Sequence, residues 1–344
     1  MVHKRKWVSH EYFMDMLAAT NLVPGPNAVE MAIHLGQIRA GFLGLLLAGF
    51  SFLLPPTVIT LVLAILYVRW GSLPQITQIF YGISPVVISI ILFSGIRIGK
   101  SALNSATTVC LALICVVASL LNIDEAVIIL SSGLISVLIY IFRTNKITPV
   151  LFLLSFTVNF ITVCSFVNSK LANLGLYFLK IGFILFGSGL VLFAYIHNDL
   201  VNNFQWLTER QLLDAIAVGQ FTPGPVSSSV TFIGYLIAGI PGAIISTLGI
   251  FFPSFIIVTI LGKILPKIRK SQIVQIFLNG VNAAVVALII SVTISLFKSS
   301  ISDYLTLAIF FSSLFIIWKY KIDPIWLILS GAIIGLMKYV FILQ

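Results

Sequence analysis

Apolar stretches of about 18 residues or more recur along the whole chain, and each is long enough to cross the hydrocarbon core of a bilayer. Only 9% of the 344 residues are charged, whereas soluble domains carry about 25%. The pattern predicts an all-α polytopic membrane protein, because a helix satisfies its own backbone hydrogen bonds in lipid. The net charge of +10 is therefore interpreted as loop charge that sets topology, and a nucleic-acid partner is not expected.

The second half of the chain repeats the first. Pro24-Gly25-Pro26 aligns with Pro223-Gly224-Pro225, and the residues around the triplets keep the same spacing apart from one single-residue gap. Further matched pairs are Trp7 and Trp206, Asp15 and Asp214, Gly36 and Gly234, Pro55 and Pro253, and Gly82 and Gly280. Such matches at Trp, Asp, Pro and Gly are not expected by chance. They indicate two homologous repeats, an architecture typical of secondary transporters.

The repeat defines the expected organisation of the chain. We expect an N-terminal repeat over residues 1–146, a linker helix over 147–170 and a C-terminal repeat over 171–344. The span near 174–197 has no counterpart in the first half, so the first helix of the N-terminal repeat is expected to be missing.

Each Pro-Gly-Pro triplet predicts a helix break at membrane depth. Proline lacks the backbone donor and obstructs the preceding turn, and glycine adds no steric restraint. Backbone freed in this way is tolerated inside a membrane only where protein buries it or a cavity solvates it. A helix that restarts after the triplet offers unpaired N–H groups and a positive dipole end, which suit an anion. The alternative is a pair of structural kinks without a ligand.

Polar residues near the breaks indicate what such a site could bind. Ser227 and Ser228 follow the second triplet and can donate hydrogen bonds to an oxyanion. Lys180 lies inside the apolar segment FLKIGFILFGSG, where it either reaches a membrane surface or supplies positive charge to a cavity.

Glu30 and His34 occur only in the first repeat. Their spacing places them on one helical face, where their side chains can meet. Ionisable groups inside a membrane often mark a relay, and both groups can titrate near neutral pH in a suitable environment, so proton coupling is one hypothesis. The alternative is that His34 lies close enough to the interface to be solvated, with Glu30 paired to it.

The distribution of basic residues bears on topology. If each triplet segment crosses the membrane once as a broken helix, the Lys and Arg residues between spans gather mainly on one side. If the segments are re-entrant, the same residues divide almost evenly. The positive-inside rule therefore favours single crossings, and it then predicts that the two repeats are inverted.

Enzymatic signatures are lacking in this sequence. There is no GxxxxGK[ST] loop for a nucleotide phosphate, and the histidines and cysteines lack metal-ligand spacing. We therefore expect no catalytic residues, no metal and no cofactor.

The stretches NLVPGPNAVEMAIHLGQIRAG, FLKIGFILFGSG and LLDAIAVGQFTPGPVSSSVTFIGYLIAGIPGA resemble the chromate ion transporter family of the long, two-domain type. The resemblance covers nearly the whole chain. It implies a bacterial or archaeal inner-membrane protein that extrudes chromate and confers resistance. Two departures are the missing first helix with its FGGP-like motif, and Ser188 within a segment that is usually FGGG-like.

With this resemblance, the expected substrate contacts combine the triplets with the segment around Lys180. They are Pro24, Gly25, Pro26, Asn27, Lys180, Gly187, Gly189, Pro223, Gly224, Pro225, Ser227 and Ser228, with Glu30 and His34 as proton-coupling residues. The expected partners are chromate or a sulfate-like oxyanion, the lipid bilayer and, as an assembly to test, a second copy of the chain. Uniport, proton coupling and exchange all stay open. The alternatives are transport of another anion, such as sulfate or an organic acid, and a lipid-phosphate flippase or scramblase.

Overall fold

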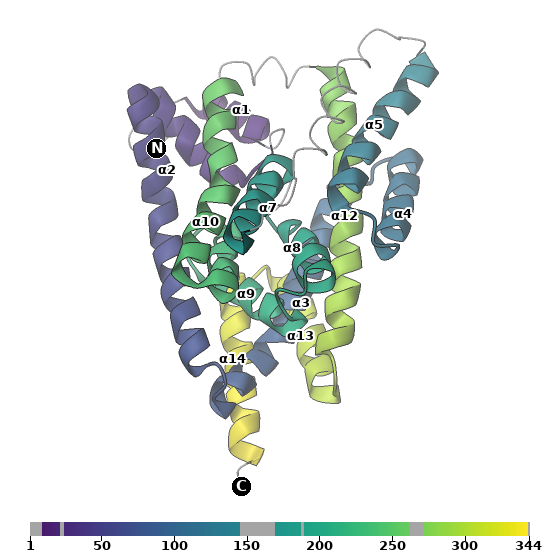
Figure 1. The fold of residues 1–344 in the computed structure, drawn as a ribbon. Coiled ribbons are helices and arrows are strands. Elements are labelled where there is room, and N and C mark those ends of the chain that lie inside the picture. Colours follow the sequence, from purple (N-terminus) through teal and green to yellow (C-terminus); the bar gives the residue numbers. More distant parts are fainter. Residues whose placement is uncertain (1–8, 21–23, 145–168, 187–188, 262–270, 343–344) are drawn as a thin grey trace.

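A computed structural model of the chain describes residues 9–20, 24–144, 169–186, 189–261 and 271–342 (Figure 1). Every regular element in these ranges is helical. The expected linker helix near 147–167 lies outside the described residues, as do Gly187 and Ser188.

The helices of the first half follow one another with short connections. They are α1 (His10–Thr20), α2 (Asn27–Trp70), α3 (Pro74–Ala102), α4 (Ala106–Leu120) and α5 (Glu125–Thr144). Helix α4 begins at Ser105, whose side chain accepts a hydrogen bond from the backbone N–H of Thr108 in a capping box.

The second half has the same succession of long helices after an additional segment. Its elements are α7 (Lys170–Ile184), α8 (Leu192–Ile196), the π-helix η1 (His197–Asn203), α9 (Glu209–Phe221), the 3₁₀-helix η2 (Val226–Ser228), α10 (Ser229–Leu261), α12 (Gln272–Ser300), α13 (Tyr304–Tyr320) and α14 (Pro324–Ile342). A capping box of Thr208 and Gln211 begins α9.

Several described helices fit the thickness of a bilayer. Five are long and apolar enough to cross it, namely Asn27–Trp70, Pro74–Ala102, Glu125–Thr144, Val226–Ile260 and Gln272–Ser300. Large apolar side chains are exposed along them, such as Leu43 and Phe142, as expected for surfaces that face lipid. These helices confirm the prediction of an all-α polytopic membrane protein.

Helices α2 and α10 contain the same sharp bend at equivalent residues. Ala40 and Gly41 leave helical geometry with φ/ψ of −143/27° and 60/−143°, and Ala238 and Gly239 do so with −145/25° and 63/−152°. The chain folds back on itself here, because Gly36 and Gly44 on either side of the first bend pack backbone against backbone. Each helix therefore consists of a short arm before the bend and a long arm after it.

The chain also turns back at each Pro-Gly-Pro triplet. Met16 of α1 packs on Met31 and Leu35 of the short arm of α2, so these two helices form a hairpin. At the second triplet, a Cβ added to Gly219 would lie 2.8 Å from the Cβ of Ser229, ten residues further along the chain. In both halves the helices before and after the triplet therefore lie side by side as a hairpin. The basic residues favoured a broken helix that continues in one direction, but a helix break by itself does not determine that direction.

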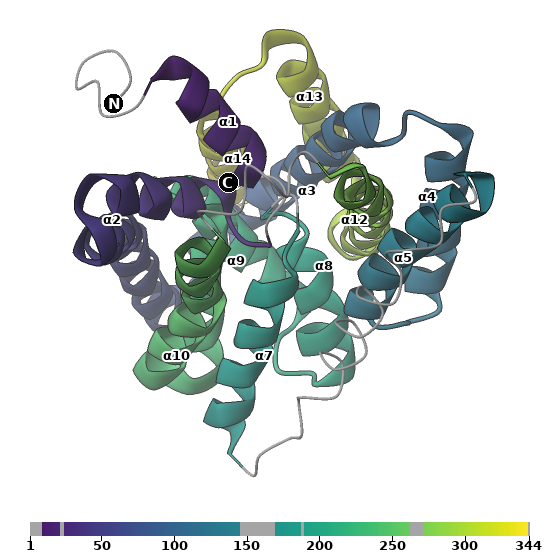
Figure 2. The ribbon, with the colours of Figure 1, turned by 90° about the horizontal axis from the view of Figure 1, so that it is seen from above.

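The two halves exchange their last helices. Helix α3 of the first half packs against α13 and α14, whereas α12 of the second half packs against α4 and α5. The long arms of α2 and α10 also pack together, and they run in opposite directions in Figure 1. The view in Figure 2 shows α3, α8, α9 and α14 gathered in the middle of this arrangement.

Candidate functional site

The two Pro-Gly-Pro triplets lie at the centre of contacts between the halves. The backbone N–H of Gly25 donates a hydrogen bond to the carbonyl of Leu185 at the end of α7, at 2.7 Å. A Cβ added to Gly189 would lie 3.9 Å from Val226, just after the second triplet. The segment that joins α7 to α8 therefore touches the first triplet and the residue that follows the second, and it carries Gly189 into the same region.

Each triplet packs against the other half of the chain at equivalent positions. A Cβ on Gly25 would lie 2.7 Å from the hydroxyl of Ser254 in α10, and a Cβ on Gly224 would lie 2.7 Å from Pro56 in α2. Pro56 and Ser254 follow the matched prolines Pro55 and Pro253. The glycines allow this close approach because they carry no side chain that would meet Ser254 or Pro56.

We call the region where the two triplets meet the other half of the chain and the α7–α8 segment the triplet junction. Glu30 carries a carboxyl group at this junction. Its side chain adjoins Gly25, it has no exposed surface, and neither carboxyl oxygen has a hydrogen-bond partner. An ion buried in this way is costly, so the arrangement suits a protonated, neutral carboxyl group. His34 is also buried one turn further along α2, but no hydrogen bond or ion pair joins it to Glu30 in the described structure.

Buried hydroxyls without partners surround the same elements. They belong to α2, η2 and α10, and they are the side chains of Thr60, Ser227, Ser229, Ser246 and Ser254. Buried polar groups usually have a partner, so these hydroxyls are positions at which a bound water or ligand would supply the missing hydrogen bond. Ser228 differs from its neighbours, because its hydroxyl lies 3.2 Å from that of Thr222 and closes the second hairpin turn.

The remaining triplet residues frame the site. Pro26 and Pro225 are buried and stand immediately before α2 and η2, with extended backbone. Pro223 and Gly224 are exposed, Pro24 and Asn27 are half-buried, and Asn27 is the first residue of α2. The described triplet residues thus converge with Glu30 and the α7–α8 segment.

Comparison with known proteins identifies the family. The family model described as "Chromate transporter" matches residues 1–137 and 172–336, which are both halves of the chain. The chain belongs to the chromate transporter family. No solved structure matches it.

Named relatives of this family member come from several organisms. The chain is 31% identical to the "Chromate transport protein" of Cupriavidus metallidurans, over 98% of this chain and 86% of that protein. It is 30% identical to the "Probable chromate transport protein" of Synechococcus elongatus, over 98% of this chain and 88% of that protein. An uncharacterized transporter of Methanocaldococcus jannaschii is 26% identical, over 97% of this chain and 87% of that protein.

Lys180 of this chromate transporter family member has an acidic partner. Its ammonium group lies 3.1 Å from Oδ2 of Asp124, and Asp124 also caps α5 by accepting hydrogen bonds from the N–H groups of Ala126 and Val127. Sequence analysis missed Asp124 and its neighbour Glu125. The sequence feature that could have identified these two acids is their position at a helix start, just after the turn residues Leu121–Asn122.

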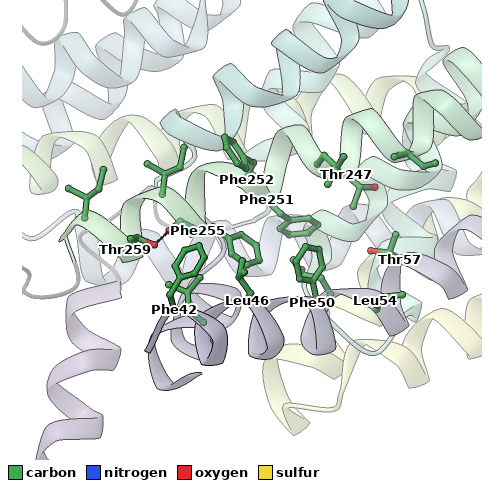
Figure 3. A pocket seen from close by; sticks show the side chains of 16 residues that line it. Phe42, Leu46, Phe50, Leu54, Thr57, Thr247, Phe251, Phe252, Phe255 and Thr259 are labelled. Carbon is green, nitrogen blue, oxygen red and sulfur yellow. Dashed lines mark hydrogen bonds between the residues drawn. The ribbon is translucent and has the colours of Figure 1, made fainter. Parts of the chain in front are cut away.

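A large groove lies elsewhere, between the long arms of α2 and α10 (Figure 3). It measures about 610 Å³ and is lined by apolar side chains, with three threonines among them. Equivalent residues of the two halves line this groove, such as Phe50 and Leu248. A dianion would find neither charge nor enough hydrogen-bond donors in this groove. We therefore take the triplet junction as the candidate oxyanion site.

Proposed function

We propose that this chain is a secondary transporter that exports chromate or a sulfate-like oxyanion across the inner membrane of a bacterium or archaeon. The observation that carries the proposal is the set of buried polar groups without hydrogen-bond partners at the two triplets, namely the hydroxyls of Ser227, Ser229 and Ser254 and the carboxyl group of Glu30. The names of two relatives supply the substrate class, the "Chromate transport protein" of Cupriavidus metallidurans and the "Probable chromate transport protein" of Synechococcus elongatus.

The proposed site binds a doubly charged anion without a dedicated free cation. Lys180 is already paired with Asp124, so the anion would be held by hydroxyl donors and by N–H groups at the start of α2. Such a site binds an anion weakly enough to release it. The inside-negative membrane potential favours expulsion by about 2.3 kcal/mol per charge per 100 mV, so efflux needs no nucleotide.

Glu30 provides a route to proton coupling. In its neutral form the carboxyl group can donate a hydrogen bond to the anion, whereas its ionised form would repel it. Anion affinity would then depend on the protonation of Glu30. His34 lies one turn further along the same helix and is the proposed proton partner on the way to the end of the short arm.

We also propose that the halves, residues 1–146 and 171–344, are inverted repeats. Three observations support this assignment: the opposite directions of α2 and α10, the reciprocal contacts of Gly25 with Ser254 and of Gly224 with Pro56, and the exchange of terminal helices. Two re-entrant hairpins that approach from opposite sides would place both triplets near the middle of the membrane.

Chromate flux into proteoliposomes tests the proposal, with sulfate as competitor. We expect saturable flux in the wild type. Loss of one unpaired hydroxyl, in Ser227→Ala or Ser254→Ala, should raise KM roughly tenfold or more, because a hydrogen bond to a charged group is worth about 1.5–3 kcal/mol. Ser330→Ala is the matched control, because its hydroxyl already donates to the carbonyl of Leu327.

The outcomes separate this function from the alternatives. Flux of sulfate or an organic acid without chromate flux would reassign the substrate. Lipid translocation without any anion flux would favour a scramblase, although the groove between α2 and α10 has no Lys or Arg among its lining residues. A correctly inserted protein that moves neither anion nor lipid would refute transport by this site.

A further inference from the structure

A polar cavity lies away from the triplets, between α4, α5, η1 and α12. It measures about 120 Å³, which is room for several water molecules. Most of its lining side chains are polar, namely Ser119, Asn122, Glu125, His197, Asn198, Asn202, Ser291 and Ser295. In a chain that is 59% hydrophobic, such a concentration of polar groups among packed helices indicates a functional role.

Glu125 is the buried carboxyl group of this cavity. Its residue is only 3% exposed, and its Oε2 has no hydrogen-bond partner. It stands in the first turn of α5 beside the capping residue Asp124. An unpaired carboxyl oxygen that lines a polar cavity is placed to accept or release a proton.

The charges around Glu125 favour a cation over an anion. The neighbouring acids are Asp124 of its own helix start and Asp199 of η1, and Lys180 of α7 is the facing base, paired with Asp124. Tyr177 of α7 and Tyr195 of α8 face the same acids with buried hydroxyls, and α12 contributes serines. No group of three or more His, Cys, Asp or Glu residues in the described ranges could hold a metal ion. The proton is the cation that best fits a single carboxyl group that bonds Asn198 and keeps one oxygen unpaired.

His197 lies between the cavity and a partly exposed carboxyl group, although its Nε2 makes no hydrogen bond. It lines the cavity, and its Nε2 lies 3.5 Å from Oε1 of Glu209, whose side chain is 37% exposed. It begins the π-helix η1, an element that is rare in proteins and frequent at functional sites. Glu125, His197 and Glu209 thus form a series of titratable groups from a buried cavity to solvent.

We propose that Glu125 is a second proton-binding site, which exchanges protons with solvent through the cavity water, His197 and Glu209. A proton taken up by the carboxylate of Glu209 passes to the imidazole of His197. The imidazole releases one proton to the cavity water, which delivers one to Glu125, so only a proton moves along the series. The site is separate from Glu30, and its role in coupling rests on the proposed transport function.

Paired measurements of proton and anion movement test the inference. Full-length protein is reconstituted in vesicles that contain a fluorescent pH indicator, and chromate flux is driven by a potassium diffusion potential. We expect wild-type chromate flux to carry protons. Glu125→Gln should lower proton flux at least tenfold and flatten the pH dependence of chromate flux, and Glu125→Asp should restore both. Asp323→Asn is the matched control, because Asp323 occupies the equivalent helix start before α14, where it bonds the N–H of Ile325.

Two further variants keep the test decisive if Glu125→Gln does not fold. His197→Gln and Glu209→Gln should slow proton flux while the KM for chromate stays unchanged. Wild-type proton flux and an unchanged pH profile in all three variants would overturn the proton site.

An infrared titration separates this inference from the proposed function. Purified wild-type protein should show a carboxyl band that changes with pH and is absent from Glu125→Gln. If chromate flux fails but this band is present, the substrate assignment falls and the proton site stands. If the band is the same in both proteins, the proton site is refuted whatever the substrate is.

Discussion

At the scale of single residues, the carboxyl group of Glu30 offers the sharpest test of coupling at the triplets. It has no exposed surface and no hydrogen-bond partner, so its ionisation would place an unpaired charge beside the proposed anion site. Glutamine resembles the protonated form. We therefore expect Glu30→Gln to retain chromate affinity at high pH, where the wild type loses it, and to flatten the pH profile of KM.

The measurement is KM for chromate in proteoliposomes across neutral and alkaline pH. Gln37→Glu, which adds a carboxyl group on the same short arm at a less buried position, serves as control. A Glu30→Gln profile that follows the wild type at every pH would remove Glu30 from the coupling hypothesis.

Asp303, in the connection between α12 and α13, gives a second prediction at this scale. Burial alone would raise the pKa of this carboxyl group, but hydrogen bonds from Tyr81, Thr306 and Lys338 hold it well below its usual value. A lowered pKa contributes stability that is present at neutral pH and is lost as the pH falls below about 4. Tyr81 belongs to α3, so these bonds join the first half to the second.

Asp303→Asn should therefore lower the midpoint of thermal unfolding at pH 7 by a few degrees. Asparagine can still cap α13, so the change isolates the charge. The difference from the wild type should shrink as the pH approaches 3. The midpoints are measured in detergent. If the wild type and Asp303→Asn differ in unfolding midpoint by the same amount from pH 7 to pH 3, the carboxylate charge does not contribute to this stability.

At the scale of helices, the bends at Ala40–Gly41 and Ala238–Gly239 decide how each long helix is placed. Gly41 and Gly239 have φ of 60° and 63° with extended ψ, a region that is essentially restricted to glycine. A Cβ on Gly41 would meet nothing within 4 Å, so an alanine there would add backbone strain without a steric clash.

We expect Gly41→Ala and Gly239→Ala each to destabilise the protein by about 1–3 kcal/mol. Gly99→Ala is the control, because Gly99 lies inside α3 and an added Cβ would make only ordinary contacts there, at 3.5 Å or more. The readout is thermal unfolding in detergent. Equal stability of Gly41→Ala and Gly99→Ala would argue against a strained turn at this bend.

The helices and the site differ in how far the sequence predicted them. Apolar runs and repeated prolines depend on local chemistry, so the spans and the helix breaks could be read from the chain. The reversal at each triplet could not, because Met16 meets Met31 only through packing that no charge pattern encodes. The Lys180–Asp124 pair joins residues 56 positions apart, and the role of Lys180 depended on that distant partner. Glu125 was missed because a single acid at a helix start is usually a capping residue.

At the scale of the whole molecule, the exchange of terminal helices makes each half depend on the other. Helix α3 meets α14 where Gly82 packs against the backbone of Gly331 and Gly335, and α12 meets α5 where Gly280 packs against Ser132. Ser132 also donates a hydrogen bond to the carbonyl of Gly280, at 2.8 Å. Gly82 and Gly280 are matched by the internal repeat, so one packing rule serves both interfaces.

This equivalence predicts that Gly82→Ala and Gly280→Ala have similar effects. A Cβ on Gly82 would lie 2.8 Å from the backbone nitrogen of Gly335, and one on Gly280 would lie 2.9 Å from the carbonyl carbon of Ser132, so in each case two helix backbones must separate. Overpacking of this kind costs about 1–3 kcal/mol. We expect both variants to unfold at lower temperature than Gly99→Ala, the control on α3. A marked drop in unfolding temperature for only one of the two variants would mean that the two interfaces are packed differently. It would also weaken the case for two halves related by two-fold symmetry.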